Sequence, residues 1–223
     1  MKKHIILTLW FLLLLFVSSN AQIKKLYLEA GVSANSYKGS LNEGFGNYTS
    51  SFNLGIRFCK KQRLNGSVNF LYGNIDGQTP VFAVKNSKGD FVYPPNYFKT
   101  SLVTFDYSLR FNLISKKKSL LYLGGGVGLL RFNVQDQDGN NLANNATTRD
   151  KGEDYSNMSL SFPVFIGYNY ILSNDYRLGV QAQFLNPRTD YLDNTSNWSP
   201  YVTSDNVLSF KFFLSVPINL ASN

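Results

Sequence analysis

Eight segments of the chain alternate apolar and polar residues with the two-residue period of a β-strand. They cover residues 26–34, 52–58, 64–72, 105–113, 120–132, 160–170, 178–184 and 208–216. This period places successive side chains on opposite faces of a sheet, so a segment has one apolar and one polar face. In segment 120–132 both parities are apolar, and its two faces stay unassigned.

The connections between these segments are short and long in alternation. The short ones are 59–63, 115–119 and 173–175, and the long ones are 35–48, 73–97, 133–157 and 186–205. An even number of strands of about ten residues, with tight turns at one end and long loops at the other, is typical of outer-membrane barrels. We therefore predict an all-β fold, an eight-stranded antiparallel transmembrane β-barrel of the outer membrane.

A closed sheet can cross a bilayer because it pairs its backbone N–H and C=O groups within the protein. Its apolar faces then contact lipid and its polar faces line the lumen. The alternative is a soluble lipocalin-like barrel or sandwich with the apolar faces inward. Rows of Leu, Phe, Tyr and Val favour the membrane barrel, since lipid-facing surfaces end in aromatic girdles, here Tyr72, Phe98, Tyr170 and Phe184.

The polar faces carry charged residues at or near the middle of the strands. We expect these residues to be barrel-interior charges: Glu29, Arg57, Asp106, Arg110, Arg177 and Lys211. An eight-stranded barrel has an interior just wide enough for side chains to fill, and an unpaired buried charge is costly. The two acids should therefore pair with some of the four basic residues, which argues against a wide solute channel.

The first 21 residues have the pattern of a secretory signal peptide. A basic start, Lys2 and Lys3, precedes an uncharged apolar run over residues 5–17, which is too short to span a bilayer comfortably. Small residues lead up to Ala21, so we predict cleavage there, with the outer-membrane β-barrel domain over residues 22–223. The alternative is an uncleaved membrane anchor. No Cys follows Ala21, which excludes lipoprotein processing.

Histidine and cysteine are nearly absent. His4 is the single histidine and lies in the predicted signal peptide, so the mature chain has no Ser-His-Asp triad and lacks the commonest zinc ligand. Cys59 is the single cysteine and permits no internal disulfide or thiolate cluster. We expect no enzyme activity, no catalytic residue, no cofactor and no metal site.

Three motifs have both a ligand-binding and a structural interpretation. The glycines of 124–128 lack the helix and the Lys-Ser/Thr pair of a phosphate loop, so we interpret them as positions where the wall curves. Asp190 and Asp193 suit Ca²⁺, but we favour a role in fixing the start of the last outer loop. The loop acids Asp136, Asp138, Asp150, Glu153 and Asp154 are interpreted as solvated.

The net charge is +8, and basic residues gather at the short-turn end of the predicted barrel. This periplasmic basic rim consists of Lys24, Lys25, Lys60, Lys61, Arg63, Lys116, Lys117 and Lys118. The residues lie in turn-like clusters rather than along a helix, so we expect no nucleic acid partner. The rim suits an acidic protein or anionic headgroups. Alternatively, the lysines only keep the turns solvated.

Four stretches resemble the family of small outer-membrane β-barrels that includes the type IX secretion component PorG. They are residues 29–32 with 35–42, residues 122–128 with 131–133, residues 162–168, and residues 188–193. The most specific match is the run Thr189, Asp190, Tyr191, Leu192 and Asp193. The chain departs from the family at Ser40 and Asn194, where aspartate is common, and it lacks a terminal aromatic residue.

This resemblance implies a non-enzymatic barrel of the bacterial outer membrane, in contact with outer-membrane lipid. It also implies a role as an anchor or accessory of an envelope assembly such as type IX secretion, with a periplasmic protein of the secretion ring as the partner. Two other functions stay open: a surface-binding or structural barrel with ligand-contacting outer loops, and a narrow channel.

Overall fold

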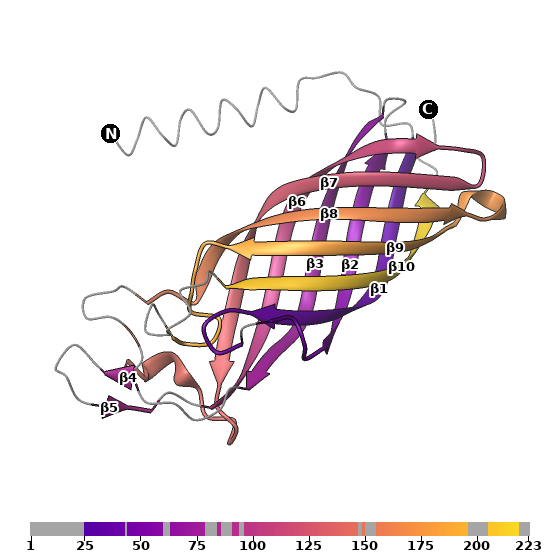
Figure 1. Cartoon of the computed structure of the whole chain (residues 1–223). Coiled ribbons are helices and arrows are strands. Elements are labelled where there is room, and N and C mark those ends of the chain that lie inside the picture. The colour runs from indigo at the N-terminus through magenta and orange to yellow at the C-terminus, as the bar shows by residue number, and fades with distance from the viewer. Residues whose placement is uncertain are drawn as a thin grey trace, which may run out of the picture.

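Eight strands close into one antiparallel barrel (Figure 1), with the spatial order β1-β10-β9-β8-β7-β6-β3-β2. They are β1 (Lys25–Lys38), β2 (Thr49–Cys59), β3 (Leu64–Gln78), β6 (Tyr97–Ser115), β7 (Ser119–Gln135), β8 (Met158–Ile171), β9 (Arg177–Pro187) and β10 (Asn206–Ile218). A computed structural model describes residues 25–42, 44–59, 63–78, 84–85, 91–93, 96–146, 149, 155–195 and 205–218. The predicted eight-stranded barrel is confirmed.

Strands that follow one another in the barrel pair as antiparallel neighbours, and the sheet closes where β1 meets β10. That seam runs from Leu26 opposite Ile218 to Lys38 opposite Asn206. The start of β1, the end of β10 and the tight turns that follow β6 and β8 lie at one end of the barrel, and the long loops lie at the other (Figure 1). We call these the inner and the outer end, after the periplasm and the cell exterior.

Four short elements lie outside the barrel wall. The strands β4 (Val84–Lys85) and β5 (Phe91–Val92) pair as a small hairpin beyond the outer end (Figure 1). The 3₁₀ turns are η1 (Leu142–Asn144), in the loop after β7, and η2 (Ser173–Asp175), between β8 and β9. Within the described ranges, no helix has the length and apolar character needed to span a membrane. The predicted signal peptide, Lys24, Lys60 and Lys61 lie outside the described residues.

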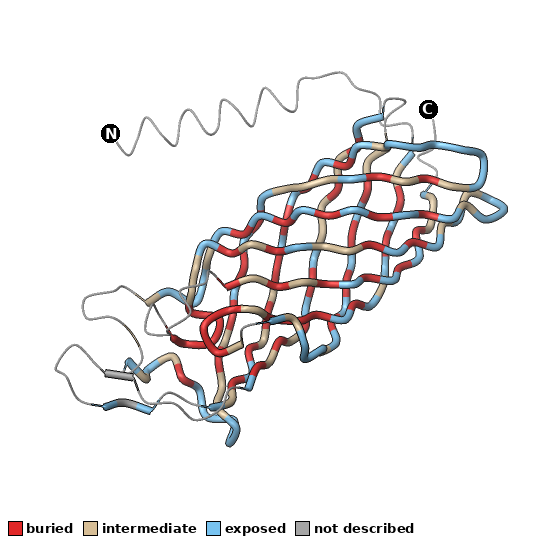
Figure 2. Tube along the Cα trace, viewed as in Figure 1, coloured by how far each residue is buried: buried red, intermediate tan, exposed pale blue. Residues whose placement is uncertain are grey.

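Burial alternates along the strands (Figure 2), and the apolar parity faces outward as predicted. Val32, Phe105 and Val164 are 57–60% exposed, whereas Glu29 and Ser67 are fully buried. A soluble barrel would show the opposite arrangement, because water outside the wall would drive the apolar side chains into the core. A closed wall of exposed Leu, Phe, Tyr and Val is instead matched to hydrocarbon.

The structure assigns the two faces of β7, which the sequence left open. Tyr122, Leu130 and Phe132 point into the lumen and are at most 1% exposed, whereas Leu123 and Leu129 face outward. The inward glycines between them lie against the neighbouring strand. A Cβ atom on Gly126 would lie 2.3 Å from the carbonyl oxygen of Tyr107, and one on Gly128 would lie 2.6 Å from the Cβ atom of Asp106. These glycines therefore permit close strand packing, consistent with the structural interpretation.

Several strands continue further toward the outer end than the sequence predicted. Residues 73–78, expected in a loop, belong to β3, and β6 begins at Tyr97. The apolar alternation stops there because the outward positions become polar, as at Asn74 and Asp76, although strand pairing continues. Phe98 was expected in the outward girdle, and this was wrong: it is 0% exposed inside the barrel, on the inward parity of β6.

Candidate functional site

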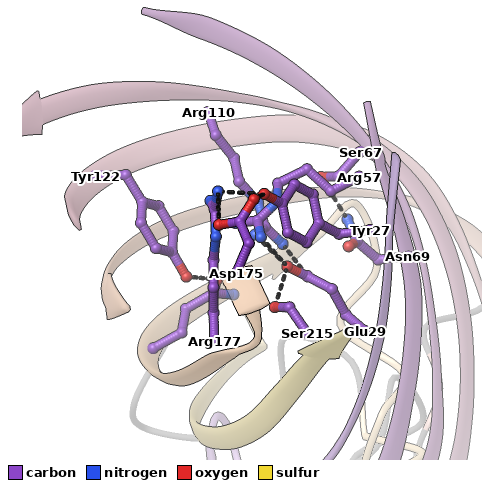
Figure 3. A network of polar contacts seen from close by, with 11 residues as sticks. Tyr27, Glu29, Arg57, Ser67, Asn69, Arg110, Tyr122, Asp175, Arg177 and Ser215 are labelled. Carbon is purple, nitrogen blue, oxygen red and sulfur yellow. Dashed lines mark hydrogen bonds and ion pairs between the residues drawn. The ribbon is translucent and has the colours of Figure 1, made fainter. Parts of the chain in front are cut away.

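Glu29 lies at the centre of an ion-pair cluster that crosses the inner half of the lumen (Figure 3). Its Oε1 and Oε2 accept hydrogen bonds from Arg110 Nη1 and Nη2, at 3.1 and 2.8 Å. Arg57 Nη2 lies 3.4 Å from Oε1, and Ser215 Oγ donates to the same oxygen at 3.1 Å. The three charged side chains are at most 2% exposed. We call Glu29, Arg57 and Arg110 the inner ion cluster.

Aromatic rings surround the two guanidinium groups of this cluster. Arg57 lies over the ring of Tyr27 at 4.7 Å, and Arg110 lies over that of Tyr122 at 5.1 Å. Cation–π contact of this kind adds to the attraction by Glu29. Tyr122 Oη also donates to Gln181 Oε1 at 2.9 Å, which links β7 to β9. The inner lumen is thus filled by side chains from strands all around the wall.

The other predicted interior charges behave differently. Asp106 Oδ1 accepts from Asn69 Nδ2 at 2.8 Å and from Ser108 Oγ at 2.5 Å. Among the described residues it makes no ion pair within 4.0 Å, so the expected pairing of Asp106 with a basic residue was wrong. Two neutral donors satisfy one of its oxygens instead. Lys211 Nζ lies 4.9 Å from the centroid of the Phe213 ring.

Arg177 belongs to a network at the inner mouth rather than to the inner ion cluster (Figure 3). Its Nη2 donates to Asp175 Oδ1 at 3.2 Å and to Tyr27 Oη. Lys25 Nζ and Tyr27 Oη donate to Asp175 Oδ2 at 2.7 and 2.5 Å. Partial burial opposes the charge on Asp175, but these hydrogen bonds hold its pKa below the ordinary value. This acid from η2 therefore draws Lys25 and Arg177 together.

The rest of the described periplasmic basic rim consists of exposed residues at the tight turns, Arg63, Lys116, Lys117 and Lys118. Lys116 and Ser119 close their turn with two backbone hydrogen bonds, of 2.8 and 3.4 Å. Of the rim residues that the structure describes, only Lys25 makes an ion pair. The rim therefore presents a concentrated positive charge at the inner end.

A loop segment after β9 closes the outer half of the lumen. Residues 191–195, which we call the outer plug, are all buried, with Leu192 at 0% exposure. Tyr191 and Leu192 pack into an apolar cluster in the outer lumen. Its other buried members are Tyr37, Leu41, Leu71, Ile75, Phe98, Leu102, Leu130, Phe132, Val134, Leu142, Leu185 and Val207. The outer plug thus excludes water from the barrel mouth by apolar packing.

Two aspartic acid side chains and one phenol hold the outer plug in place. Tyr37 Oη lies 2.8 Å from Asp193 Oδ2 and 2.5 Å from Asp205 Oδ1. Backbone N–H groups of Leu41 and Thr195 donate to Asp193 at 2.9 Å, and that of Leu192 donates to Asp205 at 2.7 Å. Burial raises the pKa of Asp193 to about 7, and burial beside Asp193 raises the pKa of Asp205 well above its usual range.

Arg149 and Asn194 connect the outer plug to the loop after β7. Asn194 has a left-handed backbone, with φ of 62°, and its Oδ1 accepts from Arg149 Nε at 3.1 Å. Arg149 Nη2 also donates to the carbonyl oxygens of Leu142 and Ala143, at 3.1 and 2.9 Å. Its guanidinium group lies 3.6 Å from the centroid of the Tyr155 ring. The plug is therefore tied to a second outer loop.

The motif 189–193 therefore has a structural role in this barrel. Asp193 uses its oxygens on Tyr37, Leu41 and Thr195, while Thr189 Oγ1 accepts from the N–H of Tyr191 at 3.2 Å. In the described ranges, no three His, Cys, Asp or Glu side chains gather in a way that suits a metal ion. Asp136 caps its own turn, accepting from the N–H groups of Asp138 and Asn140 at 3.0 and 2.8 Å.

Sequence reasoning missed three residues of this outer site, Tyr37, Asp205 and Arg149. Tyr37 was assigned to a loop, although it shares the inward parity of Glu29 on β1. Asp205 is separated from Asp193 by a long loop, and Arg149 lies within another. Their convergence depends on the barrel bringing loops together in space, and no local spacing in the sequence signals it.

Comparison with known proteins gives the fold and not a family. No family model matches the chain, and no curated protein matches it in sequence. Among solved structures, the chain is similar to Ail, the attachment invasion locus protein of Yersinia pestis, with a TM-score of 0.50 and 9% identity. The Ail structure was solved in complex with the heparin analogue sucrose octasulfate. That match covers 87% of this chain and 98% of Ail. Neisserial surface protein A gives a TM-score of 0.51 and 14% identity, over 87% of this chain and 97% of that protein.

These neighbours share the small outer-membrane barrel fold with the chain. The barrel closes without free edges, and its exposed apolar wall requires a hydrocarbon surrounding. The protein is therefore an eight-stranded β-barrel of the bacterial outer membrane.

Proposed function

We propose that the protein is a non-enzymatic outer-membrane anchor, which holds a periplasmic assembly through its basic rim. The observation that carries the proposal is the cluster Arg63, Lys116, Lys117 and Lys118, which is exposed and makes no ion pair among the described residues. A single-sign surface of this kind steers and binds partners of the opposite charge. The partner would be an acidic periplasmic protein.

The filled lumen supports this choice over a channel. The inner ion cluster and the outer plug occupy it at two levels, which leaves the rims as the surfaces for interaction. The sequence resemblance to the barrels of type IX secretion supports the finer assignment. The assembly would then be the periplasmic ring of that machine, with a ring protein as the partner.

The test replaces Lys116, Lys117 and Lys118 together by Glu in the full chain and follows co-purification of envelope proteins after membrane extraction. We expect loss of a periplasmic partner, because charge reversal turns attraction into repulsion. Replacing Asp136 and Asp138 by Lys, at the outer end, is the matched control and should leave co-purification unchanged. Deletion of the gene should also reduce the secretion of type IX cargo. Intact co-purification in the triple variant would exclude the rim as the docking surface.

A second candidate function is surface binding through the outer loops. It is favoured by the hairpin β4–β5, where Phe91 and Tyr93 are 65 and 67% exposed. Exposed aromatic residues on a protruding hairpin are typical anchors of protein interfaces. Replacing both residues by Ser and measuring adhesion of whole cells to host matrix or to neighbouring cells tests this role. Unchanged adhesion, with the barrel folded, would reject it.

A further inference from the structure

Two arginines point outward from the barrel wall where its apolar surface ends. Arg131 follows the lipid-facing residues Val127 and Leu129 on β7, and Arg188 follows Phe184 and Asn186 at the end of β9. Both arginines are exposed. Arg131 is the first charged outward residue of β7 beyond the apolar surface, and Arg188 directly follows the last residue of β9, Pro187. Side chains at this level meet the headgroups of the outer leaflet.

The two arginines flank the beginning of β8. Arg131 lies opposite Met158, and the N–H of Arg188 donates to the carbonyl oxygen of Leu160 at 2.8 Å. Since adjacent strands lie about 4.8 Å apart, the two backbones are separated by roughly 10 Å across β8. Two extended arginine side chains can reach one headgroup between them over this distance. Met158 and Leu160, which lie between, are 51 and 49% exposed and offer an apolar surface below it.

Neither arginine makes an ion pair with an acid of the described residues. Arg131 lies between Val103 and Met158, and the four ion pairs of the described residues include neither arginine. Lys99, the outward cation on β6, differs because Asp76 lies directly opposite on β3. Lys99 therefore faces an acid across the sheet, whereas neither arginine makes an ion pair among the described residues and each can bind an external anion.

We propose that Arg131 and Arg188 form a binding site for the phosphorylated headgroup of an outer-leaflet lipid. The planar guanidinium group donates two parallel hydrogen bonds to phosphate, which suits a fixed site better than a lysine ammonium group. The acyl chains of the bound lipid lie along Met158, Leu160 and the apolar wall beneath them. The site is independent of the periplasmic basic rim, because it lies at the opposite end of the barrel.

The test uses the folded barrel in nanodiscs of phosphatidylcholine that contain lipid A with or without its phosphates, and measures lipid retained with the protein after detergent extraction. We expect the wild-type barrel to prefer the phosphorylated lipid, and the double variant R131Q/R188Q to lose about tenfold or more of that preference. K99Q is the matched control and should retain it. A heat-modifiable band on gels verifies that each variant is folded.

Two outcomes would overturn the proposal. One is equal retention of both lipids by the wild-type barrel. The other is a double variant that loses stability to the same extent with and without lipid phosphate, which would mean that the arginines bind acids of this chain. Free glucosamine phosphate at millimolar concentration distinguishes the ligand sources. It should not displace the lipid, because it lacks the acyl chains that contact the wall.

Discussion

The two halves of the lumen are closed by different chemistry. In the inner half, Glu29 pairs with Arg57 and Arg110, and all three residues belong to strands of the wall. In the outer half, a loop segment inserts Leu192 into an apolar cluster and is held by Asp193 and Asp205. The inner closure is therefore built from strand residues alone, whereas the outer closure depends on a loop segment seated in the lumen.

The difference between the two closures has a consequence for stability. Loss of an inner contact leaves charges buried between strands, so its cost falls on the whole barrel. Loss of an outer contact frees a loop while the strands stay paired, so its cost is local. The lumen thus combines a closure that unfolds only with the barrel and one that can open alone.

The largest effect is expected for Glu29→Gln. This substitution preserves the size of the side chain but leaves Arg57 and Arg110 buried without their counter-charge, which costs about 3–5 kcal/mol. Reversible urea unfolding of the barrel in detergent or lipid measures it. Asp175→Asn, at the inner mouth, serves as the control. A loss below about 1 kcal/mol for Glu29→Gln would contradict the role assigned to the inner ion cluster.

Leu192→Ala should have the next largest effect, and a local one. Its side chain is fully buried, and truncation of a buried leucine costs about 3 kcal/mol. Hydrogen exchange should show faster opening of residues 191–195, while the urea midpoint of the barrel changes little. Leu129→Ala, on the lipid-facing wall, should not accelerate this exchange. A fall in global stability without faster loop exchange would mean that the two closures are not separable.

The outer plug should also respond to pH, in the direction set by its acids. The pKa of Asp193 is raised from 3.8 to about 7. Below pH 3.8 the acid is protonated whether the plug is docked or withdrawn, so docking is strongest there. As the pH rises toward 7, only the docked state keeps the proton, and docking weakens until both states have lost it.

The measurement is hydrogen exchange of Leu41, Leu192 and Thr195 between pH 5 and pH 8, corrected for the intrinsic exchange rate. We expect lower protection at pH 8, and a smaller pH dependence in Asp193→Asn, which does not titrate. The inner ion cluster provides the comparison, since its protection should follow global stability. Protection of the plug that rises with pH would show that the acids are docked as carboxylates.

The smallest effect is expected for Asp175→Asn. The Lys25–Asp175 pair has side chains that are 54 and 26% exposed, and such ion pairs contribute about 1 kcal/mol or less. Urea unfolding at low and at high salt measures the contribution, which salt should reduce further. A loss of unfolding free energy as large as that of Glu29→Gln would show that the inner-mouth network stabilises the whole barrel as the inner ion cluster does.

The barrel wall could be predicted from the sequence because its rule is local. Side chains two residues apart in a strand lie on the same face of the sheet. The alternation alone therefore predicts that Val32 faces outward and Ser33 faces the lumen, whatever the position of the strand in the barrel. The rule failed at Phe98, which was expected to face lipid. An apolar side chain can face either lipid or the outer lumen, because the outer lumen is itself apolar. The rule also gave no face for β7, where strand pairing rather than composition decides that Tyr122 is inside.

The two closures differ in how far the sequence predicts them. Glu29 and Arg110 stand out as charges on strand faces that line a narrow barrel, so an interior cluster could be expected, although not the neutral partners of Asp106. The outer closure brings together Tyr37, Asp193 and Asp205, which are at least twelve positions apart along the chain. Their meeting depends on the path of the loops, which carry no periodic pattern.

The seam between β1 and β10 joins the two extremes of the folded domain, from Leu26 opposite Ile218 to Lys38 opposite Asn206. Neighbouring strands joined by a tight turn can pair locally, starting from the turn. The strands β1 and β10 are joined by no turn, so their pairing requires contacts between residues that are almost the whole domain apart in sequence. Until they pair, the first and last strands present bare hydrogen-bonding edges. Membrane insertion should therefore end with this junction, and a chain truncated within β10 should remain an open, protease-sensitive sheet.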